Sequence, residues 1–421
     1  MESLPANLVY RPDLGIAFNT GTGVEHKLDD MGQLMVDALA KGETIEGLAG
    51  RIAAEYEVEV GAVRGDIRGL LETLSADAPS SDEEGIVELF KGAEISDESV
   101  AFPVSLELEL TRRCNWGCTF CYNTWRDQKK RAGESPDIPL SSVQRMQKEA
   151  HENGLFRMRY SGGEPLMHPQ IDEIIESGAR NGLYQVVFTN GSFLTEDRAK
   201  HFADNNVREV LLSMHGTPET HNRLVGRKDG YSKVCRGIEV ALKNGIAVVT
   251  EMTLTAKNLP EATGVIDQLK GLGVSQFRVM RYVPTGRDDV RHKVKCDDFK
   301  TALRVLKSPG MKVGAPCSQK HCFSEEPNPV LTAEGVSPET KFLYPHCSAG
   351  TRWMAVSYLG EAKMCPHSTR TFGKVEEGIK GIWEERIRPF AIDGIRKNIG
   401  ERCQKCILKH ACKGGCHLNV Q

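Results

Sequence analysis

The chain has 421 residues, of which 40% are hydrophobic and 26% are charged, and its formal net charge is −3. This composition is typical of a folded protein of two or three domains, and the small charge gives no global attraction to nucleic acid or anionic lipid. The N-terminus lacks the basic start and apolar run of a signal peptide, and no apolar stretch reaches the roughly 18 residues of a membrane span. We therefore expect a cytoplasmic protein with neither a nucleic acid nor a membrane as partner.

Residues 1–78 show strand-like runs followed by helical patterns. The runs are 7–10, 15–19 and 24–28, and the helical patterns cover 31–40, a segment from about 44, and 63–74. This order predicts a small winged-helix-like module. Residues 1–80 hold fourteen Asp or Glu against six Lys or Arg, which opposes contact with phosphate, so a peptide is the expected ligand.

The segment 76–85, ADAPSSDEEG, is small, polar and acidic, and we place a linker at 79–100. Strand-like runs then alternate with helix-length segments, which is typical of βα units around a parallel sheet. The expected strands are 105–110, 156–160, 185–189, 209–213, 248–253 and 276–281. The expected helices between them are 140–153, 170–181, 196–205, 233–244 and 262–272. Six such units predict an α/β fold, an open partial (β/α)6 barrel over residues 101–300.

Thirteen cysteines are too few for a disulfide scaffold and, in a reducing compartment, more often bind metal. Three of them form Cys114-x3-Cys118-x2-Cys121, directly after the first expected barrel strand. Three thiolates in one loop can bind three irons of a [4Fe–4S] cluster and leave the fourth iron open. The alternative is a zinc site, which would need a fourth ligand close by.

Polar groups follow the later strands at the edge where barrel active sites assemble. Ser161-Gly162-Gly163-Glu164-Pro165 ends the second strand, Thr189-Asn190 ends the third, and Ser213 ends the fourth. Two glycines let the backbone approach a ligand closely, and a carboxylate can accept from an ammonium group. Each of the later elements is equally consistent with an ordinary turn or strand terminus.

Cysteines become dense again in residues 301–421, where glycine and proline interrupt shorter segments. We expect a small region held together by metal. Its cysteines are Cys317, Cys322, Cys347, Cys365, Cys403, Cys406, Cys412 and Cys416. Eight is the number needed by two fully ligated [4Fe–4S] clusters, although the connectivity does not follow from the sequence. One auxiliary iron could instead be open or be bound by His410 or His417. A zinc ribbon is the alternative.

The cysteine loop, with an aromatic residue on each side of Cys121, resembles the radical S-adenosylmethionine (SAM) superfamily, and Gly162-Gly163-Glu164-Pro165 is similar to its GGEP motif. The resemblance implies a SAM-binding [4Fe–4S] cluster and cleavage of SAM to a 5′-deoxyadenosyl radical. It also implies SAM contacts from Gly162, Gly163, Glu164, Thr189, Asn190 and Ser213. The common Ser-x-Asp-Gly of the family reads Ser213-Met214-His215-Gly216 here, so the acid is absent.

The C-terminal cysteines resemble the SPASM domain, which carries auxiliary clusters. That resemblance implies one cluster on Cys347, Cys365 and Cys416 and a second on Cys403, Cys406 and Cys412. The family pattern usually ends with one further cysteine, which this sequence lacks. The N-terminal order of strands and helices resembles PqqD, the chaperone of PQQ biosynthesis, and this implies that a leader peptide adds as a strand to an exposed sheet edge.

These resemblances together imply an enzyme that matures a ribosomally made precursor peptide by a thioether or carbon–carbon crosslink or a related oxidation. An electron donor such as flavodoxin or ferredoxin would be a second partner. Two alternatives are a maturase of a folded protein, of the sulfatase-maturase type, and a haem decarboxylase. A non-enzymatic electron carrier is disfavoured because it has no use for an amine site beside an open iron. The catalytic acid or base and the substrate are not identified by the sequence.

Overall fold

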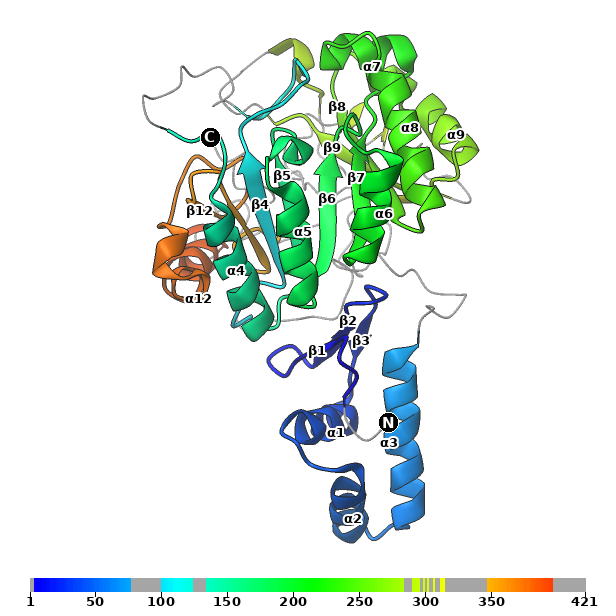
Figure 1. Cartoon of the computed structure of the whole chain (residues 1–421), viewed down its shortest axis with the longest axis vertical. Helices are drawn as coiled ribbons and strands as arrows, with labels where there is room; N and C mark the ends of the chain where they lie inside the picture. Colours follow the sequence, from blue (N-terminus) through cyan, green and yellow to red (C-terminus); the bar gives the residue numbers. More distant parts are fainter. Residues whose placement is uncertain are drawn as a thin grey trace, which may run out of the picture.

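The computed structural model describes residues 4–76, 100–123, 134–283, 290–295, 298–299, 301–302, 306, 311–314 and 347–396. Within these ranges no helix has both the length and the apolar character needed to cross a bilayer. The described chain forms a small N-terminal domain and a larger α/β body (Figure 1).

The N-terminal domain is a three-stranded antiparallel sheet followed by three helices. Its strands, in spatial order, are β1 (Leu8–Arg11), β2 (Ile16–Asn19) and β3 (Glu25–Lys27). Its helices are α1 (Asp30–Ala40), α2 (Ile45–Tyr56) and α3 (Val60–Ser75). Asp29 and Thr44 cap the first two helices by accepting from the backbone N–H groups of Gly32 and Gly47. The order of elements predicted for a winged-helix-like module is confirmed.

The larger body is built on a nine-stranded sheet in the order β10-β9-β8-β7-β6-β5-β4-β11-β12. Strands β4 to β9 are parallel and succeed one another in the chain, as a βα barrel requires. They are β4 (Ser105–Thr111), β5 (Arg157–Gly162), β6 (Tyr184–Thr189), β7 (Val207–Ser213), β8 (Ala247–Leu254) and β9 (Gln276–Arg281). These six strands match the six predicted from the sequence to within two residues at each end.

Helices connect these strands. They are α4 (Leu140–Glu152), α5 (Ile171–Arg180), α6 (Glu196–Asp204), α7 (Pro218–Val225), α8 (Gly230–Lys243) and α9 (Ala262–Gly271). Five of them were predicted, and α7 was not, because it has only eight residues and follows β7 almost directly. Short 3₁₀ turns occur at Pro165–Met167 and Leu259–Glu261.

In the described part of the chain beyond residue 300, where the sequence predicts a separate C-terminal region, the structure has three further strands. They are β10 (Lys312–Gly314), β11 (Trp353–Val356) and β12 (Ala362–Lys363). β10 pairs with β9, and β11 pairs in parallel with β4 at the opposite edge of the six strands. After β12 the chain forms α12 (Ile379–Ile382), which continues into π-helical turns at Trp383–Ile387 and Phe390–Arg396. Strands β10, β11 and β12 therefore extend the barrel sheet at both of its edges.

The strands have one apolar face and one charged face. On β8, Val248, Met252 and Leu254 pack into the main hydrophobic core under the helices, whereas Glu251 faces the other way. This alternation follows from the period of two residues in a strand. The same pattern appears on β4, where Leu106 and Leu108 are core residues and Glu107 lies between them.

The N-terminal domain packs on the amino ends of the barrel strands (Figure 1). Phe18 of β2 stacks on Phe156, with ring centroids 4.8 Å apart, and meets Tyr184 edge-on at 5.8 Å. The guanidinium of Arg157 lies 5.0 Å from the centroid of the Phe18 ring and forms an ion pair of 2.9 Å with Glu25. Because Phe18 belongs to the same hydrophobic cluster as the barrel, the two domains share one core at this point.

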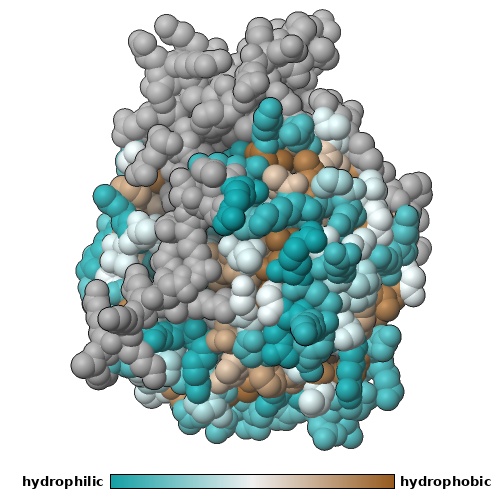
Figure 2. Space-filling model, turned by 90° about the horizontal axis from the view of Figure 1, so that it is seen from above, coloured by the Kyte–Doolittle hydropathy of each residue, from teal (hydrophilic) through white to brown (hydrophobic). Residues whose placement is uncertain are grey.

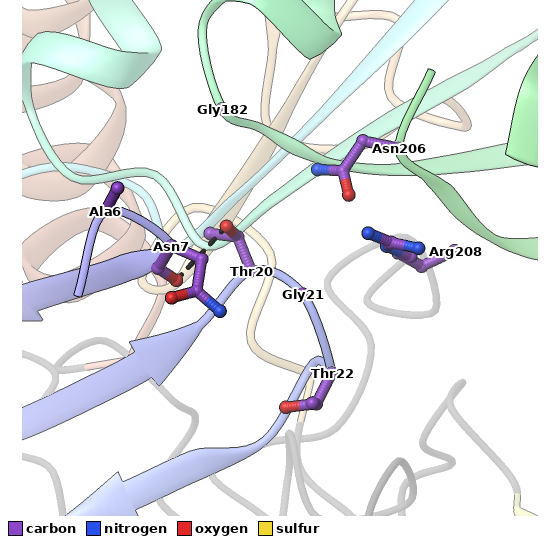
Figure 3. A pocket seen from close by; sticks show the side chains of 8 residues that line it. All are labelled: Ala6, Asn7, Thr20, Gly21, Thr22, Gly182, Asn206 and Arg208. Atoms are coloured by element: carbon purple, nitrogen blue, oxygen red, sulfur yellow. Dashed lines mark hydrogen bonds between the residues drawn. The ribbon is translucent and has the colours of Figure 1, made fainter. Parts of the chain in front are cut away.

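A polar crevice of about 530 Å³ lies beside this contact. Figure 3 shows Asn7, Thr20 and Thr22 of the N-terminal domain on one side and Asn206 and Arg208 of the barrel on the other. The crevice therefore lies between the two domains, beside the contact of Phe18 with the barrel.

Candidate functional site

The loop with the three cysteines follows β4 at the carboxyl edge of the sheet. Its backbone is held by the end of α7, because the N–H groups of Gly117 and Thr119 donate to the carbonyls of Val225 and Leu224, both at 2.9 Å. The indole N–H of Trp116 donates to Ser192 at 2.8 Å. These contacts fix the loop over the ends of β6 and β7.

Cys114, Cys118 and Cys121 are each partly exposed, as ligands of an accessible centre must be. Among the described residues, no three His, Cys, Asp or Glu side chains meet closely enough to hold a single metal ion. Thiolates of a [4Fe–4S] cluster bind different irons and need not converge on one point, so three thiols on one loop fit such a cluster.

The two glycines of the Ser-Gly-Gly-Glu motif pack against the chain that leads into the cysteine loop. Gly162 has φ +130°, and a Cβ there would lie 2.6 Å from the carbonyl oxygen of Thr111, while a Cβ on Gly163 would collide with the carbonyl of Arg113. The N–H groups of Gly163 and Glu164 donate to those same carbonyls at 2.7 and 2.8 Å. The close approach expected toward a ligand is thus made toward the protein backbone, and it places Glu164 beside the cysteine loop.

Glu164 is 1% exposed and is surrounded by hydrogen-bond donors. Its Oε1 accepts from the hydroxyl of Thr189 at 2.7 Å, and its Oε2 accepts from the backbone N–H of Asn190 at 2.8 Å. The backbone N–H of Leu166 is a third donor at 3.1 Å. Burial raises the pKa of Glu164 to about 7, against the opposing effect of these hydrogen bonds. A cation bound at this carboxylate would favour its ionised form.

The structure brings together most of the predicted SAM-contacting residues. Thr189 and Asn190, at the end of β6, contact Glu164 directly, and the Asn190 side chain also donates to Asn115 of the cysteine loop at 2.9 Å. Ser213 ends β7 at the same edge of the sheet but makes no hydrogen bond to the Glu164 group among the described contacts. The predicted cluster loop and the predicted amine site are therefore adjacent.

His215, which stands where the family pattern has an acid, is buried against the cysteine loop. Its ring lies 4.6 Å from that of Phe120, and its Nδ1 accepts from the backbone N–H of Thr253 at 3.2 Å. Burial, and secondarily the nearby His221, lower the pKa of His215 well below its usual value. His215 is therefore a neutral ring whose hydrogen is assigned to Nε2, and it can donate one hydrogen bond but carries no charge.

The C-terminal region approaches the cysteine loop from the β12 side. Lys363 of β12 lies 3.8 Å from Glu109 of β4 and donates to the carbonyl of Pro366 at 2.9 Å, next to the buried Cys365. Tyr122, which follows Cys121, donates to Glu109 at 3.2 Å. Glu109 thus connects the segment of Cys121 with the segment of Cys365.

Of the eight predicted C-terminal ligands, Cys347 and Cys365 lie in the described part of the chain. The other six, Cys317, Cys322, Cys403, Cys406, Cys412 and Cys416, lie outside the described residues.

The interpretation of the sequence missed Glu109 and Lys363. A signal for Glu109 was present, because the run Leu-Glu-Leu-Glu-Leu over residues 106–110 alternates with period two and so places both glutamates on the face opposite the leucines. Lys363 had no such signal, because its position depends on the pairing of β11 with β4.

Comparisons with known proteins match two parts of this architecture. Residues 108–263 match the family model of the radical SAM superfamily, and residues 15–77 match that of coenzyme PQQ synthesis protein D (PqqD). The AdoMet-dependent heme synthase of Methanosarcina barkeri is 26% identical over 321 residues, covering 74% of this chain and 90% of that protein. The antilisterial bacteriocin subtilosin biosynthesis protein AlbA of Bacillus subtilis is 23% identical over 328 residues, covering 75% of this chain and 67% of that protein.

Among solved structures, Streptococcus suis SuiB bound to precursor peptide SuiA superposes with a TM-score of 0.73 at 17% identity, covering 100% of this chain and 96% of SuiB. The shared fold includes both domains. The match to the radical SAM superfamily implies that the enzyme uses a [4Fe–4S] cluster and S-adenosylmethionine. These matches, together with the cysteine loop and the adjacent Glu164 site, identify a radical SAM domain at residues 108–263 and a PqqD domain ahead of it at residues 15–77.

Proposed function

We propose that this enzyme cleaves SAM reductively and modifies a ribosomally made precursor peptide that its N-terminal domain binds. Two features of the same chain carry the proposal. The Glu164 site lies beside the cysteine loop, and the sheet of the PqqD domain has an open edge among the described residues. The named relatives point the same way, because AlbA acts in the biosynthesis of a bacteriocin and SuiB binds a precursor peptide.

Residues on β5 and β6 would bind SAM. The carboxylate of Glu164 would accept a hydrogen bond from the α-ammonium group of SAM. Thr189 and the backbone of Asn190 hold this carboxylate in place through the hydrogen bonds at 2.7 and 2.8 Å. Gly162 and Gly163 keep this carboxylate against the cysteine loop, and Ser213 lies at the next strand end. Because these hydrogen bonds come from the protein itself, they fix the orientation of the Glu164 carboxylate, which lowers the entropic cost of binding SAM.

Cys114, Cys118 and Cys121 would hold the SAM-binding [4Fe–4S] cluster, which supplies the electron that cleaves SAM. The C-terminal cysteines, including Cys347 and Cys365, would hold one or two auxiliary clusters. A flavodoxin-like or ferredoxin-like protein would deliver the electron. The barrel wall around the site, built from Trp116, Met214 and the α7 helix, would exclude water from the reacting groups.

The precursor peptide would add to the β3 edge of the N-terminal sheet. Leu28 N–H donates to Gly15, and Asn19 N–H donates to Val24, so Ala17 and His26 form the hydrogen-bonded pair between β2 and β3. The backbone groups of Glu25 and Lys27 consequently point outward, and within the described residues no strand pairs with them. An extended peptide can hydrogen-bond to both without any charge complementarity.

The two proposed sites lie at opposite ends of the barrel strands. The PqqD domain contacts the amino ends of β5 and β6, through Phe156, Arg157 and Tyr184, whereas Glu164 and Thr189 follow their carboxyl ends. β5 has six residues, so this separation is roughly 20 Å at about 3.3 Å per residue. The bound peptide must therefore run along the barrel to reach the SAM site. Figure 2 views the molecule from the carboxyl end, where apolar side chains show between hydrophilic ones on the described surface.

The test is an anaerobic reconstitution of the full chain with iron and sulfide, followed by chromatographic detection of 5′-deoxyadenosine from SAM and dithionite. We expect about eight to twelve irons per chain, which corresponds to two or three [4Fe–4S] clusters, and we expect 5′-deoxyadenosine. The triple variant with alanine at positions 114, 118 and 121 should make none, whereas Cys235→Ala, in helix α8, should match the wild type. Production of 5′-deoxyadenosine by the triple variant would refute the assignment of the cluster ligands.

The peptide substrate is tested by co-expression with short reading frames adjacent to the gene and by mass spectrometry of the peptides. A loss of two hydrogens would indicate a crosslink. The same peptide should be unmodified when the enzyme lacks residues 1–78, although SAM cleavage persists. Modification by the truncated enzyme would refute the recognition role of the N-terminal domain.

Modification of a tetrapyrrole is the second candidate function, because a heme synthase is 26% identical over three quarters of this chain. The discriminating measurement is the incubation of the reconstituted enzyme with an iron tetrapyrrole bearing propionate groups. Loss of carbon dioxide from that compound, with no peptide modified, would favour this candidate.

A further inference from the structure

The inner face of the barrel carries charged side chains at positions that alternate with the apolar core residues. Glu107 and Glu109 on β4, Glu209 on β7 and Glu251 on β8 are its carboxylates. The cations near them are Arg159 on β5, Arg278 on β9 and Lys363 on β12. Within the described ranges, these four carboxylates therefore lie near cations on the same face of the sheet.

Three of these carboxylates have a cationic partner. Glu107 lies 3.9 Å from Arg159 and accepts from the hydroxyl of Ser161 at 2.8 Å. Glu109 lies 3.8 Å from Lys363, as described above. Pairing compensates for much of the cost of removing a charge from water, so the burial of Glu107 and Glu109 is explained by their ion pairs.

The third pair joins Glu209 and Arg278, whose nearest charged atoms are 3.7 Å apart. Arg278 is also the direct cross-strand neighbour of Glu251, yet its ion pair is with Glu209. Arg159, Lys363 and Arg278 therefore each lie next to a carboxylate other than Glu251, and Arg157, on the same face of β5, is paired with Glu25.

Glu251 is the carboxylate that remains. It forms no ion pair and no side-chain hydrogen bond with any other residue that the structure describes. Its side chain is partly accessible, unlike the fully buried Glu109, so it borders space rather than packed atoms. Burial raises the pKa of Glu251 to about 7, while Arg278 and Arg159 act to lower it and Glu107 acts to raise it. An unpaired acid at such a position is costly to the fold and is better explained by a ligand than by stability.

The position of Glu251 indicates which ligand it meets. It pairs across strands with Ser213, the last residue of β7 and a predicted SAM contact, so it lies close to the carboxyl edge where SAM is cleaved. The Glu164 site, which we assign to the ammonium of SAM, is formed on β5 and β6 instead. A group entering the barrel next to SAM and opposite Glu251 would belong to the substrate.

We propose that Glu251 is a specificity-determining residue that binds a positively charged side chain, lysine or arginine, of the peptide held in the barrel. The inference rests on the proposed function, in that the barrel must admit a peptide. A cationic side chain would supply the ion-pair partner that Arg278 does not, whereas a neutral side chain would cover the partly accessible carboxylate without offering it a partner, which disfavours its entry.

The experiment titrates two small probes into the full reconstituted chain saturated with SAM. The probes are Nα-acetyl-lysine methylamide and Nα-acetyl-norleucine methylamide, which differ in the terminal ammonium group, and the dissociation constants are measured by calorimetry with the probe in large excess. We expect the lysine probe to bind at least about tenfold more tightly than the norleucine probe, which corresponds to about 1.4 kcal/mol. In Glu251→Gln this preference should disappear, and in Glu251→Asp part of it should remain.

Glu239→Gln is the matched control, because Glu239 is exposed on the outer side of helix α8 and should leave the preference unchanged. Equal affinity for the two probes in the wild type, or an unchanged preference in Glu251→Gln, would overturn the proposal. The measurement involves no turnover. A chain that makes no 5′-deoxyadenosine but still selects the lysine probe would refute the proposed function and retain the charge selectivity of Glu251.

Discussion

Arg157 and Glu25 form an ion pair of 2.9 Å that is one of the contacts between the two domains. Arg157 begins β5, the strand that ends at the Ser-Gly-Gly-Glu motif, and Glu25 begins β3, the open edge of the PqqD domain. The Arg157 guanidinium also donates to the carbonyl of Gly23 at 3.0 Å. The proposed peptide-binding edge is therefore connected through one strand to the proposed SAM site.

Replacing Phe18 with alanine should loosen the docking of the PqqD domain. The side chain is fully buried and stacks on Phe156, so its loss should cost roughly 3 kcal/mol. Hydrogen exchange of β1 to β3 is the measurement, and we expect faster exchange there while β6 and β7 keep their protection. Glu43→Gln, which removes a surface ion pair with Arg51, should change the exchange little. Unchanged protection of β1 to β3 in Phe18→Ala would show that the domains are held by other contacts.

Glu164→Gln should weaken SAM binding at least about tenfold, because the amide cannot carry the charge that pairs with the ammonium group. Equilibrium dialysis with radiolabelled SAM between pH 5.5 and 7.5 is the measurement. Burial raises the pKa of Glu164 to about 7, so the wild-type affinity should increase as the pH rises toward that value and the carboxylate ionises. The variant should show no such increase. Thr189→Val, which removes one donor to Glu164, should have a smaller effect. Wild-type affinity in Glu164→Gln would contradict the ammonium site.

The separation of the two proposed sites sets a minimum length for the substrate. A leader segment on β3 and a residue at the SAM site are roughly 20 Å apart or more, which an extended chain spans with about six residues. Precursor peptides with a shorter spacer should bind but remain unmodified, whereas a spacer lengthened with glycine and serine should be tolerated, because loop closure depends only weakly on length. Mass spectrometry of a spacer series, with binding measured in parallel, tests this. Modification across two or three residues would place the leader elsewhere.

Glu251→Gln should change how stability depends on pH. Burial raises the pKa of Glu251 in the folded state to about 7, so the folded chain holds a proton there that the unfolded chain releases near pH 4.5. The stability that this proton contributes is present below about pH 4.5 and is lost as the pH rises through 7. Relative to the wild type, the variant should therefore gain stability between pH 5 and pH 8.

Because the side chain of Glu251 is partly accessible to solvent, the gain should be on the order of 1 kcal/mol, or about 2 °C in Tm, measured by thermal unfolding at both pH values. Glu239→Gln should show the same Tm difference from the wild type at pH 5 and pH 8. An equal shift for Glu251→Gln at the two pH values would mean that the carboxylate of Glu251 is ionised throughout this range.

Much of this architecture follows from local patterns in the sequence. The alternation of apolar runs with helix-length segments predicted the six parallel strands, because each buried strand needs several consecutive β-branched or apolar residues. The Ser-Gly-Gly-Glu motif and Thr189-Asn190 were placed at one sheet edge because parallel strands all end there, and the contacts of Glu164 confirm their proximity. The strand and helix order of residues 8–75 was likewise evident from periodicity.

Long-range pairing was not accessible in the same way. The sequence contains no local signal that β11 lies beside β4, because the paired residues Trp353 and Ser105 are 248 positions apart in the chain. The position of Lys363 next to Glu109 could therefore not be predicted. The docking of Phe18 on Phe156 and the commitment of Arg278 to Glu209 rather than Glu251 depend on the same kind of contact. Local propensity determined the elements and the motifs, because hydrogen bonding and side-chain alternation act between near neighbours. Tertiary packing decided which charges were paired, because distant strands meet only in the folded chain.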